Sequence, residues 1–291
     1  MDLEAVTLFA IALGTLAVPL LLFMASFMLW PSSLIKFYFW YWRRTLGLQV
    51  YHADCGGYRF CYSSRGKPSI RPSVLMLHDF SSHKDTWLSL IKYLPKHLHL
   101  LCVDMPGHEG TTRTSAEDYS IQGQVRRIRQ FVETIHLNRK PFHLVGNSMG
   151  GNVAGVYAAC YPSDVCSMTL ICPTGVKYHS KIESEKNNHE LELSEYTLGI
   201  TLIPHTPQEM EDMLKFCSHV RFKVPQQVLD VSGAWLLAEA LPSCRVDVLE
   251  NCGHSVVMER PRHTAKLILD FIISQQCLLN ATSKKKWNAS L

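Results

Sequence analysis

The chain of 291 residues is long enough for one large domain, because α/β folds of this size are routinely single domains. Its hydrophobic fraction of 47% and charged fraction of 19% describe a globular protein that carries an additional apolar segment. The net charge of +4 is mild and no basic stripe interleaved with aromatic residues occurs, so we expect no nucleic-acid partner.

The first predicted element is an N-terminal membrane anchor. No charged residue occurs from Ala5 to Ile35, and the segment from Leu8 to Trp30 is long enough to cross the hydrocarbon core of a bilayer. A cleaved signal peptide is the competing interpretation, but it would have a basic N-terminal region and a shorter apolar stretch. The pattern therefore favours an uncleaved transmembrane helix within residues 1–35.

The residues after the anchor predict its orientation. Lys36, Arg43 and Arg44 follow the span whereas no Lys or Arg precedes it, so the positive-inside rule places the rest of the chain in the cytosol. Aromatic residues gather where the chain would leave the hydrocarbon, namely Trp30, Tyr38, Trp40, Tyr41 and Trp42. We expect a single-pass membrane protein with a juxtamembrane segment over 36–57.

Apolar runs of strand length alternate with helical patterns over 58–276, which predicts one α/β domain with a mainly parallel sheet covered on both faces. The expected strands are Tyr58–Ser63, Val74–Leu77, Leu98–Val103, Phe142–Val145, Met168–Cys172 and Arg245–Leu249. The expected helices are Ile121–Ile135, Val153–Tyr161, Pro207–Phe216, Ser232–Leu241 and Arg262–Ile273. The polar stretch 174–220 reads as a lid-like insert, and the polar tail 277–291 is expected to be mobile.

The ten cysteines are scattered through apolar runs without C-x-x-C spacing. Their even number permits a disulfide framework, but such frameworks are typical of small secreted domains. Free thiols packed as small hydrophobic side chains in a reducing compartment are the favoured interpretation.

The segment from His143 to Gly151 reads HLVGNSMGG and contains the pattern G-x-S-x-G around Ser148. A bare match is weak evidence, because chance gives it a probability of roughly one in ten in a chain of this length. Here, however, the pattern follows a short apolar strand and opens a helix, which is the arrangement of a nucleophile elbow. The backbone N–H of Met149 would then lie at a helix N-terminus, where it can stabilise an oxyanion. The alternative is a glycine-rich turn with an inert serine.

A candidate general base follows near the C-terminus. Asn251-Cys252-Gly253-His254 comes directly after a predicted strand, and α/β hydrolases place their histidine in the loop after the last strand, in the order Ser, acid, His. His254 fits that position. His78, which ends the first buried run, is expected to support the oxyanion loop rather than to transfer a proton.

Five segments together carry a family resemblance: LMLHDFSSHKDTW, LLCVDMPGHEGTTR, FHLVGNSMGGNVAGVYAACYP, VRFKVPQQ and LENCGHSVVMERP. Behind this N-terminal anchor, and in this order, they resemble the membrane-anchored monoacylglycerol lipases of the α/β-hydrolase-domain family over nearly the whole chain. The resemblance implies the α/β-hydrolase fold and a serine hydrolase that cleaves monoacylglycerols, including 2-arachidonoylglycerol, and related lysophospholipids. It implies an active site facing the cytosol on late endosomal, lysosomal or plasma membranes, and we expect no metal or cofactor.

Carried over by position, the resemblance makes Ser148 the nucleophile and His254 the general base. Phe80 and Met149 would supply the two backbone N–H groups of the oxyanion hole. The insert after Pro173 would form the lid that shapes the acyl channel.

The oxyanion loop departs from the family's pattern. His78-Asp79-Phe80 stands where the family has His-Gly-Phe, and glycine permits backbone angles that an aspartate tolerates less well. A carboxylate beside a developing oxyanion would also repel it unless the side chain points away.

The region of the catalytic acid departs further. Between Gln227 and Val228 about forty to fifty residues of the family's pattern look absent, including one sheet strand and the acid itself, as an internal deletion would leave. Asp230 is the nearest replacement, although it could instead cap the following helix, and Asp247 lies in the predicted histidine strand. Because an orienting acid is worth roughly 10⁴-fold in rate, the alternative function is a catalytically impaired, membrane-anchored form with a binding role.

Overall fold

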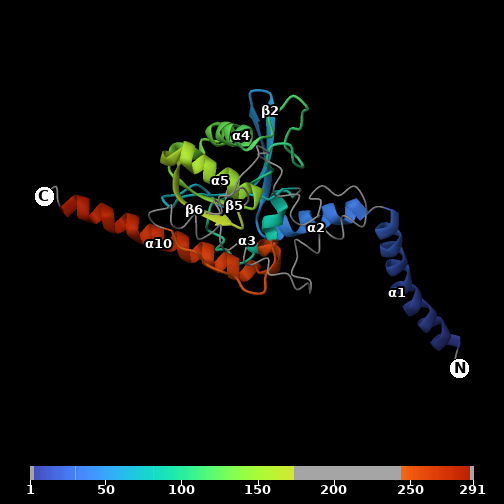
Figure 1. Cartoon of the computed structure of the whole chain (residues 1–291). Helices are drawn as coiled ribbons and strands as arrows, with labels where there is room; N and C mark the ends of the chain where they lie inside the picture. Colours follow the sequence, from blue (N-terminus) through green and yellow to red (C-terminus); the bar gives the residue numbers. More distant parts are fainter. Residues whose placement is uncertain (1–2, 30, 81, 174–243, 289–291) are drawn as a thin grey trace, which may run out of the picture. The chain divides into compact units, whose positions relative to one another are not determined.

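The computed structural model describes residues 3–29, 31–80, 82–173 and 244–288 (Figure 1). Its contacts divide the chain into two units, Met1–Gly47 and Leu48–Leu291. Several predictions fall outside the described residues: the lid-like insert, the helices Pro207–Phe216 and Ser232–Leu241, the junction near 227–228 and Asp230.

The first unit contains two helices, α1 (Leu3–Leu29) and α2 (Pro31–Thr45). Within α1 the segment Val6–Ser26 has a mean hydropathy of 2.4 and is long and apolar enough to cross a membrane. This segment overlaps the predicted span. The helix α2, which we did not predict, begins with a proline at its first position, where a missing N–H costs no hydrogen bond.

The second unit is built on a sheet whose described strands follow the order β1-β2-β4-β3-β5-β6. Their bounds are β1 (Gln49–Cys55), β2 (Tyr58–Arg65), β3 (Val74–Leu77), β4 (Leu100–Val103), β5 (Phe142–Asn147) and β6 (Val165–Ile171). The strand β2 pairs antiparallel with β1 and β4, whereas β4, β3, β5 and β6 run parallel. The prediction of a mainly parallel sheet is confirmed.

The edge strand β1 lies upstream of residue 58, within the segment expected to be juxtamembrane. Only Ala53 and Cys55 of this strand are buried, so it has no continuous apolar run that would reveal it. It joins β2 through Gly56 and Gly57, whose φ angles of 58° and 86° suit glycine in a tight hairpin turn.

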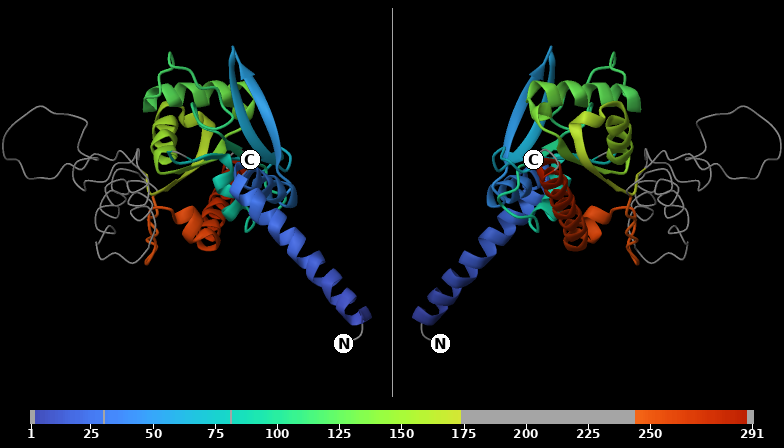
Figure 2. Two further views of the ribbon diagram at one scale, coloured as in Figure 1. Left: turned by 90° about the vertical axis from the view of Figure 1, so that its right-hand side faces the viewer. Right: turned by 90° about the vertical axis from the view of Figure 1, so that its left-hand side faces the viewer.

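Helices cover both faces of the sheet (Figures 1 and 2). One face carries α4 (Ile121–Thr134) and α5 (Met149–Cys160), and the other carries α3 (Leu88–Ile91) and α10 (Pro261–Asn288). Short helical turns connect them: η1 (Lys84–Trp87), η2 (Leu137–Arg139), η3 (Pro162–Asp164) and α9 (Val256–Glu259). The N-terminus of α4 is capped by Ser120, whose Oγ accepts the N–H of Gly123 at 3.1 Å.

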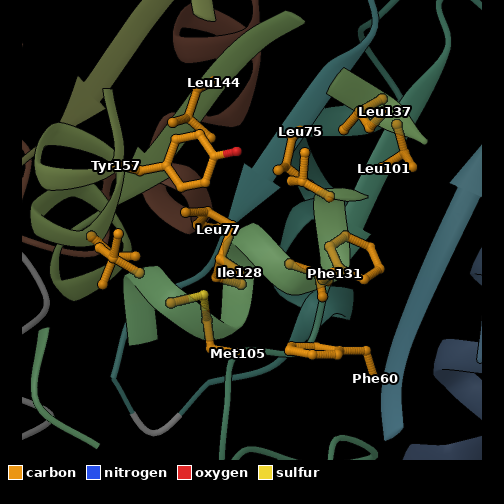
Figure 3. Packing of buried hydrophobic residues seen from close by; sticks show 14 of the residues in the cluster. Phe60, Leu75, Leu77, Leu101, Met105, Ile128, Phe131, Leu137, Leu144 and Tyr157 are labelled. Atoms are coloured by element: carbon orange, nitrogen blue, oxygen red, sulfur yellow. The ribbon is translucent and has the colours of Figure 1, made fainter. Parts of the chain in front are cut away.

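The core lies between the sheet and the helices α4 and α5 (Figure 3). Leu75, Leu101 and Leu144 share one register level of the parallel strands, and all three are buried. The apolar stripe predicted for α4 supplies Ile128, which is fully buried against them, and Phe131 adds an aromatic contact with Phe60 at 5.2 Å between ring centroids.

Two predicted elements differ from the structure. Residues 245–249 are not a strand, because a strand needs a hydrogen-bonded neighbour and no described strand pairs with this segment. The last helix continues past Ile273 to Asn288, so the tail is helical as far as residue 288. Neither proline nor glycine interrupts 274–288, which explains the extension. Seven of the cysteines carry free thiols, as predicted: Cys55, Cys61, Cys102, Cys160, Cys166, Cys244 and Cys252.

Candidate active site

Ser148 stands at a sharp turn between β5 and α5. Its backbone has φ 51° and ψ −115°, a strained conformation of the kind that recurs at functional sites. Its N–H donates to the carbonyl of Ile171 at the end of β6 (2.8 Å), and its carbonyl accepts the N–H of Gly151 in the first turn of α5 (2.9 Å). The strand–turn–helix elbow predicted around Ser148 is therefore present.

The glycines of the motif are required by close approach of backbone atoms. A Cβ on Gly146 would lie 2.2 Å from the carbonyl oxygen of Gly150. A Cβ on Gly150 would lie 2.4 Å from the carbonyl oxygens of both Leu77 and His78. Because these atoms belong to the backbone of the elbow, of β3 and of the residue that follows β3, they cannot rotate aside, and only glycine fits.

His254 reaches Ser148 from a loop 106 residues further along the chain. Its Nε2 lies 2.8 Å from the Oγ of Ser148, which is a normal hydrogen-bond distance. In the tautomer with its proton on Nδ1, the imidazole accepts the serine hydroxyl proton at Nε2. The serine is 5% exposed, whereas His254 is only partly buried, so the pair is shielded from solvent mainly on the serine side.

The histidine loop is braced by two charged side chains that follow it. The N–H of Gly253 donates to Oε2 of Glu259 at 3.1 Å. The Arg260 guanidinium donates to the carbonyl of Asn251 at 2.9 Å, and Asn251 has a φ of 52°, which asparagine tolerates better than most residues. Sequence reasoning missed both side chains, although they lie only five and six residues after His254.

The short helix α9, which follows the histidine loop, packs against α3 in the N-terminal half of the hydrolase unit. Val257 is 1% exposed, and its carbonyl accepts the hydroxyl of Ser89 on α3 at 3.0 Å. The sulfur of Met258 lies 3.8 Å from the same hydroxyl. His254 is thus positioned by packing against α3.

His78 joins the oxyanion loop to the loop after β4. Its Nε2 accepts the backbone N–H of Met105 at 2.9 Å, so the proton resides on Nδ1, which donates to the carbonyl of Asp79 at 2.7 Å. The side chain is fully buried, and this burial lowers the pKa of His78 to about 3. A neutral imidazole with both nitrogens engaged holds the loop, which agrees with the supporting role that we predicted.

Asp79 occupies the position of the family's glycine without adopting a left-handed backbone conformation, since its φ is not positive. Its Oδ1 is buried and has no hydrogen-bond partner among the described residues. Phe80 is 45% exposed and its ring lies edge-on to His108 at 6.1 Å. Met149 begins α5, and the first N–H groups of a helix have no partner within it.

Of the two candidate acids, the structure describes Asp247, which pairs with Arg245 rather than with His254. Asp230 lies outside the described residues, so its role stays a prediction. Asp247 forms an ion pair with Arg245 at 2.7 Å, and both side chains are more than a third exposed.

A buried ion pair supports the loop after β4. Lys84 Nζ lies 2.8 Å from Oδ2 of Asp104, and the two side chains are 6% and 0% exposed. The other carboxylate oxygen accepts the backbone N–H of Lys84 at 2.7 Å, and the backbone carbonyl of Asp104 accepts the hydroxyl of Thr111 at 2.7 Å. These bonds fix the residues that flank Met105 and hence the partner of His78.

No group of three or more His, Cys, Asp or Glu side chains suited to a metal ion occurs in the residues that the structure describes. Elsewhere, His143 is buried next to Ser167 and Cys166, and burial lowers its pKa to about 4. Burial also raises the pKa of the Cys166 thiol to about 11, which disfavours the reactive thiolate.

The strand order, the elbow and the serine–histidine contact together define a serine hydrolase of the α/β-hydrolase class. A family model described as the alpha/beta hydrolase fold matches residues 72–209. Among solved structures, a putative lipase from Acinetobacter baumannii AYE has 21% identity and a TM-score of 0.68, covering 83% of this chain and 96% of that chain. A membrane phospholipase A has 23% identity and a TM-score of 0.69, covering 90% and 98%.

Curated relatives are more similar. The monoacylglycerol lipase ABHD6 of Rattus norvegicus is 54% identical over 340 positions, covering 99% of this chain and all of the relative. The Homo sapiens protein of the same name is 54% identical, covering 94% of this chain and 97% of the relative. The chain belongs to the ABHD6 family of α/β hydrolases.

The alignment with the Rattus norvegicus relative is longer than the chain itself, as a deletion would make it. It spans 340 positions, whereas the chain has 291 residues, so about fifty positions have no counterpart in this chain. This number agrees with the forty to fifty residues that the junction at Gln227 suggests are absent.

Proposed function

We propose that this protein hydrolyses monoacylglycerols, such as 2-arachidonoylglycerol, and related lysophospholipids through an acyl-enzyme intermediate on Ser148. The observation that carries the proposal is the 2.8 Å contact between Ser148 Oγ and His254 Nε2 at a strained elbow. The names of the relatives supply the substrate class, since they are monoacylglycerol lipases.

In the first half-reaction His254 Nε2 takes the hydroxyl proton as Ser148 Oγ attacks the ester carbonyl carbon. The negative charge that develops on the carbonyl oxygen is stabilised by the backbone N–H groups of Met149 and Phe80. The intermediate then collapses with cleavage of the ester bond, and the imidazolium returns its proton to the departing glycerol alkoxide.

In the second half-reaction water replaces the alcohol. His254 takes one proton from water as the oxygen attacks the acyl carbon, and Ser148 leaves with that proton. The free fatty acid is released and the enzyme returns to its starting state. Burial of Ser148 reduces its contact with bulk water, which strengthens its hydrogen bond to His254.

The imidazolium formed in both steps needs an orienting partner at Nδ1, and Asp230 is the residue that we propose for this role. Its support is the order of residues, because it falls between Ser148 and His254 as the acid does in α/β hydrolases. Without an acid the expected rate falls by roughly 10⁴-fold but not to that of water.

We propose further that the apolar helix α1 is a single-pass anchor and that the hydrolase unit faces the cytosol on late endosomal, lysosomal or plasma membranes. The support is the apolar segment Val6–Ser26 together with basic residues only on its C-terminal side. An apolar substrate would then reach the site by lateral diffusion in the bilayer. Full activity of a chain lacking α1 on membrane-borne substrate would contradict this.

The test of the catalytic proposal is labelling with a fluorophosphonate probe, which reacts only with an activated serine. The full chain should be labelled and Ser148→Ala should not, while His254→Gln should label more slowly because no base takes the hydroxyl proton. Ser167→Ala, on β6, is the matched control and should label normally. Absence of labelling in a folded sample would instead support a binding role.

The role of Asp230 is tested separately by turnover of a monoacylglycerol. Asp230→Asn should lower the rate steeply, with a Tm close to that of the parent chain. Undiminished turnover would remove Asp230 from the mechanism while leaving the serine–histidine pair intact.

A further inference from the structure

The helix α2 presents an unusual set of exposed aromatic side chains. Five large apolar residues of this helix are at least half exposed: Ile35, Phe37, Tyr38, Trp40 and Tyr41. Such a concentration over 15 residues is costly in water, where apolar surface is driven towards an apolar phase. Trp and Tyr combine an apolar ring with a polar atom and therefore favour boundaries between apolar and wet surroundings.

The charges of α2 share one side of the helix, and a stripe of apolar side chains lies on the other side. At about 100° per residue, Leu34, Tyr38 and Tyr41 share one stripe. Lys36 and Arg43, seven residues apart, share another stripe on the far side. Arg44 adds a third positive charge, and the helix contains no acidic residue. Trp40 lies between Lys36 and Arg44 on the basic side, whereas Trp42 lies near Tyr38 on the apolar side. The helix is therefore amphipathic, and all of its charges are basic.

The position of α2 in the chain limits what it can contact. It begins at Pro31, two residues after α1 ends and five after the apolar segment ends at Ser26. The helix α1 continues only three residues past Ser26, a rise of ~5 Å, so its end, next to the start of α2, stays at the headgroup level of any bilayer that α1 spans. A helix with an aromatic side and a basic side at that depth has the composition of interfacial membrane helices.

We propose that α2 lies along the membrane surface, with the side of Tyr38, Tyr41 and Trp42 against the acyl chains and its basic side binding anionic phospholipid headgroups. The inference rests on the anchoring role given to α1 above. Lys36, Arg43 and Arg44 supply the charge complementarity. The bilayer thus has a second attachment point on this chain besides the span.

The first test measures the depth of two tryptophans in the full chain, reconstituted into vesicles of phosphatidylcholine with phosphatidylserine. Lipids brominated near the headgroup should quench the fluorescence of Trp40 and Trp42 more strongly than lipids brominated deep in the acyl chain. The quenched component should shrink in Trp40→Phe/Trp42→Phe. Equal fluorescence with and without bromine would mean that neither side chain contacts lipid, and would overturn the proposal.

Alkaline extraction of the same vesicles separates this proposal from the anchoring that it rests on. A chain that stays with the lipid while Trp40 and Trp42 remain unquenched has a working anchor, and only the proposal for α2 fails. A chain that is extracted has no transmembrane anchor, and both proposals fail.

The second test removes the charges by Lys36→Gln, Arg43→Gln and Arg44→Gln in one variant. Each loss should weaken the attraction to anionic lipid about fivefold, so quenching of Trp40 should no longer increase when phosphatidylserine is added. The control variant neutralises Lys67, Lys92 and Lys96, which are exposed residues of the hydrolase unit. An equal effect of the control would mean that net charge alone is responsible, and would overturn the assignment to α2.

Discussion

Acidification should destabilise the protein through His78. Burial lowers the pKa of this imidazole to about 3, whereas a histidine in an unfolded chain has a pKa near ~6.5. Because the folded pKa is the lower one, the unfolded state binds the proton first. The stability associated with the neutral imidazole is fully present above about pH 6.5 and is lost progressively as the pH falls towards 3.

The size of the effect follows from the shift. One pKa unit corresponds to ~1.4 kcal/mol, so the complete loss would be about 5 kcal/mol. At about pH 5 the unfolded imidazole is already mostly protonated and the folded one is not, which costs ~2 kcal/mol of unfolding free energy. For a domain of this size that difference lowers Tm by about 4–8 °C.

The assay compares the full chain in detergent with His78→Gln, by thermal unfolding at about pH 7.5 and about pH 5. A glutamine amide can accept the N–H of Met105 and donate to the carbonyl of Asp79, but it does not titrate in this range. The drop in Tm on acidification should be smaller in the variant by about 4–8 °C. His52→Gln, on the exposed part of β1, is the control. An unchanged drop in His78→Gln would refute the reasoning.

Three further predictions concern the site and its supports. Gly150→Ala should abolish fluorophosphonate labelling and lower Tm, because its Cβ meets two backbone carbonyls at 2.4 Å; normal labelling would show that the elbow can open. Lys84→Met should destabilise the chain by about 3–5 kcal/mol, since it leaves the carboxylate of Asp104 buried without its cation; a Tm equal to the parent's would contradict this. Glu259→Ala should slow labelling by about 10- to 100-fold through a displaced histidine loop, with recovery in Glu259→Gln, which keeps an acceptor for Gly253; equal rates in both variants would exclude a positioning role.

Elements whose residue pattern follows from their own burial could be predicted from the sequence. The strand β3 matches its prediction, Val74–Leu77, because a short run of apolar residues bounded by polar ones has few other stable placements. The helix α4 matches within one residue, since its apolar stripe and its Ser120 cap agree with each other. The contact between Ser148 and His254 followed from chain order and the elbow pattern.

Elements that depend on a particular neighbour could not be predicted in this way. The strand β1 has one exposed face and exists because β2 pairs with it. Residues 245–249 have an alternating pattern typical of a strand but no described partner. Glu259 and Arg260 contact the histidine loop because the chain turns back on itself after His254. An irregular loop of this kind leaves no periodic pattern in the sequence.

The packing of the histidine loop against α3 affects how much the length of the segment between Ser148 and His254 can vary. His254 is held through α9 against α3, an element that precedes Ser148 in the chain. The length of the segment between the two active-site residues is therefore weakly constrained, because removing about fifty residues from it changes the entropy of loop closure by less than ~1 kcal/mol. A deletion in this segment can therefore leave the contact between Ser148 and His254 in place even where it removes other parts of the site, such as the acid.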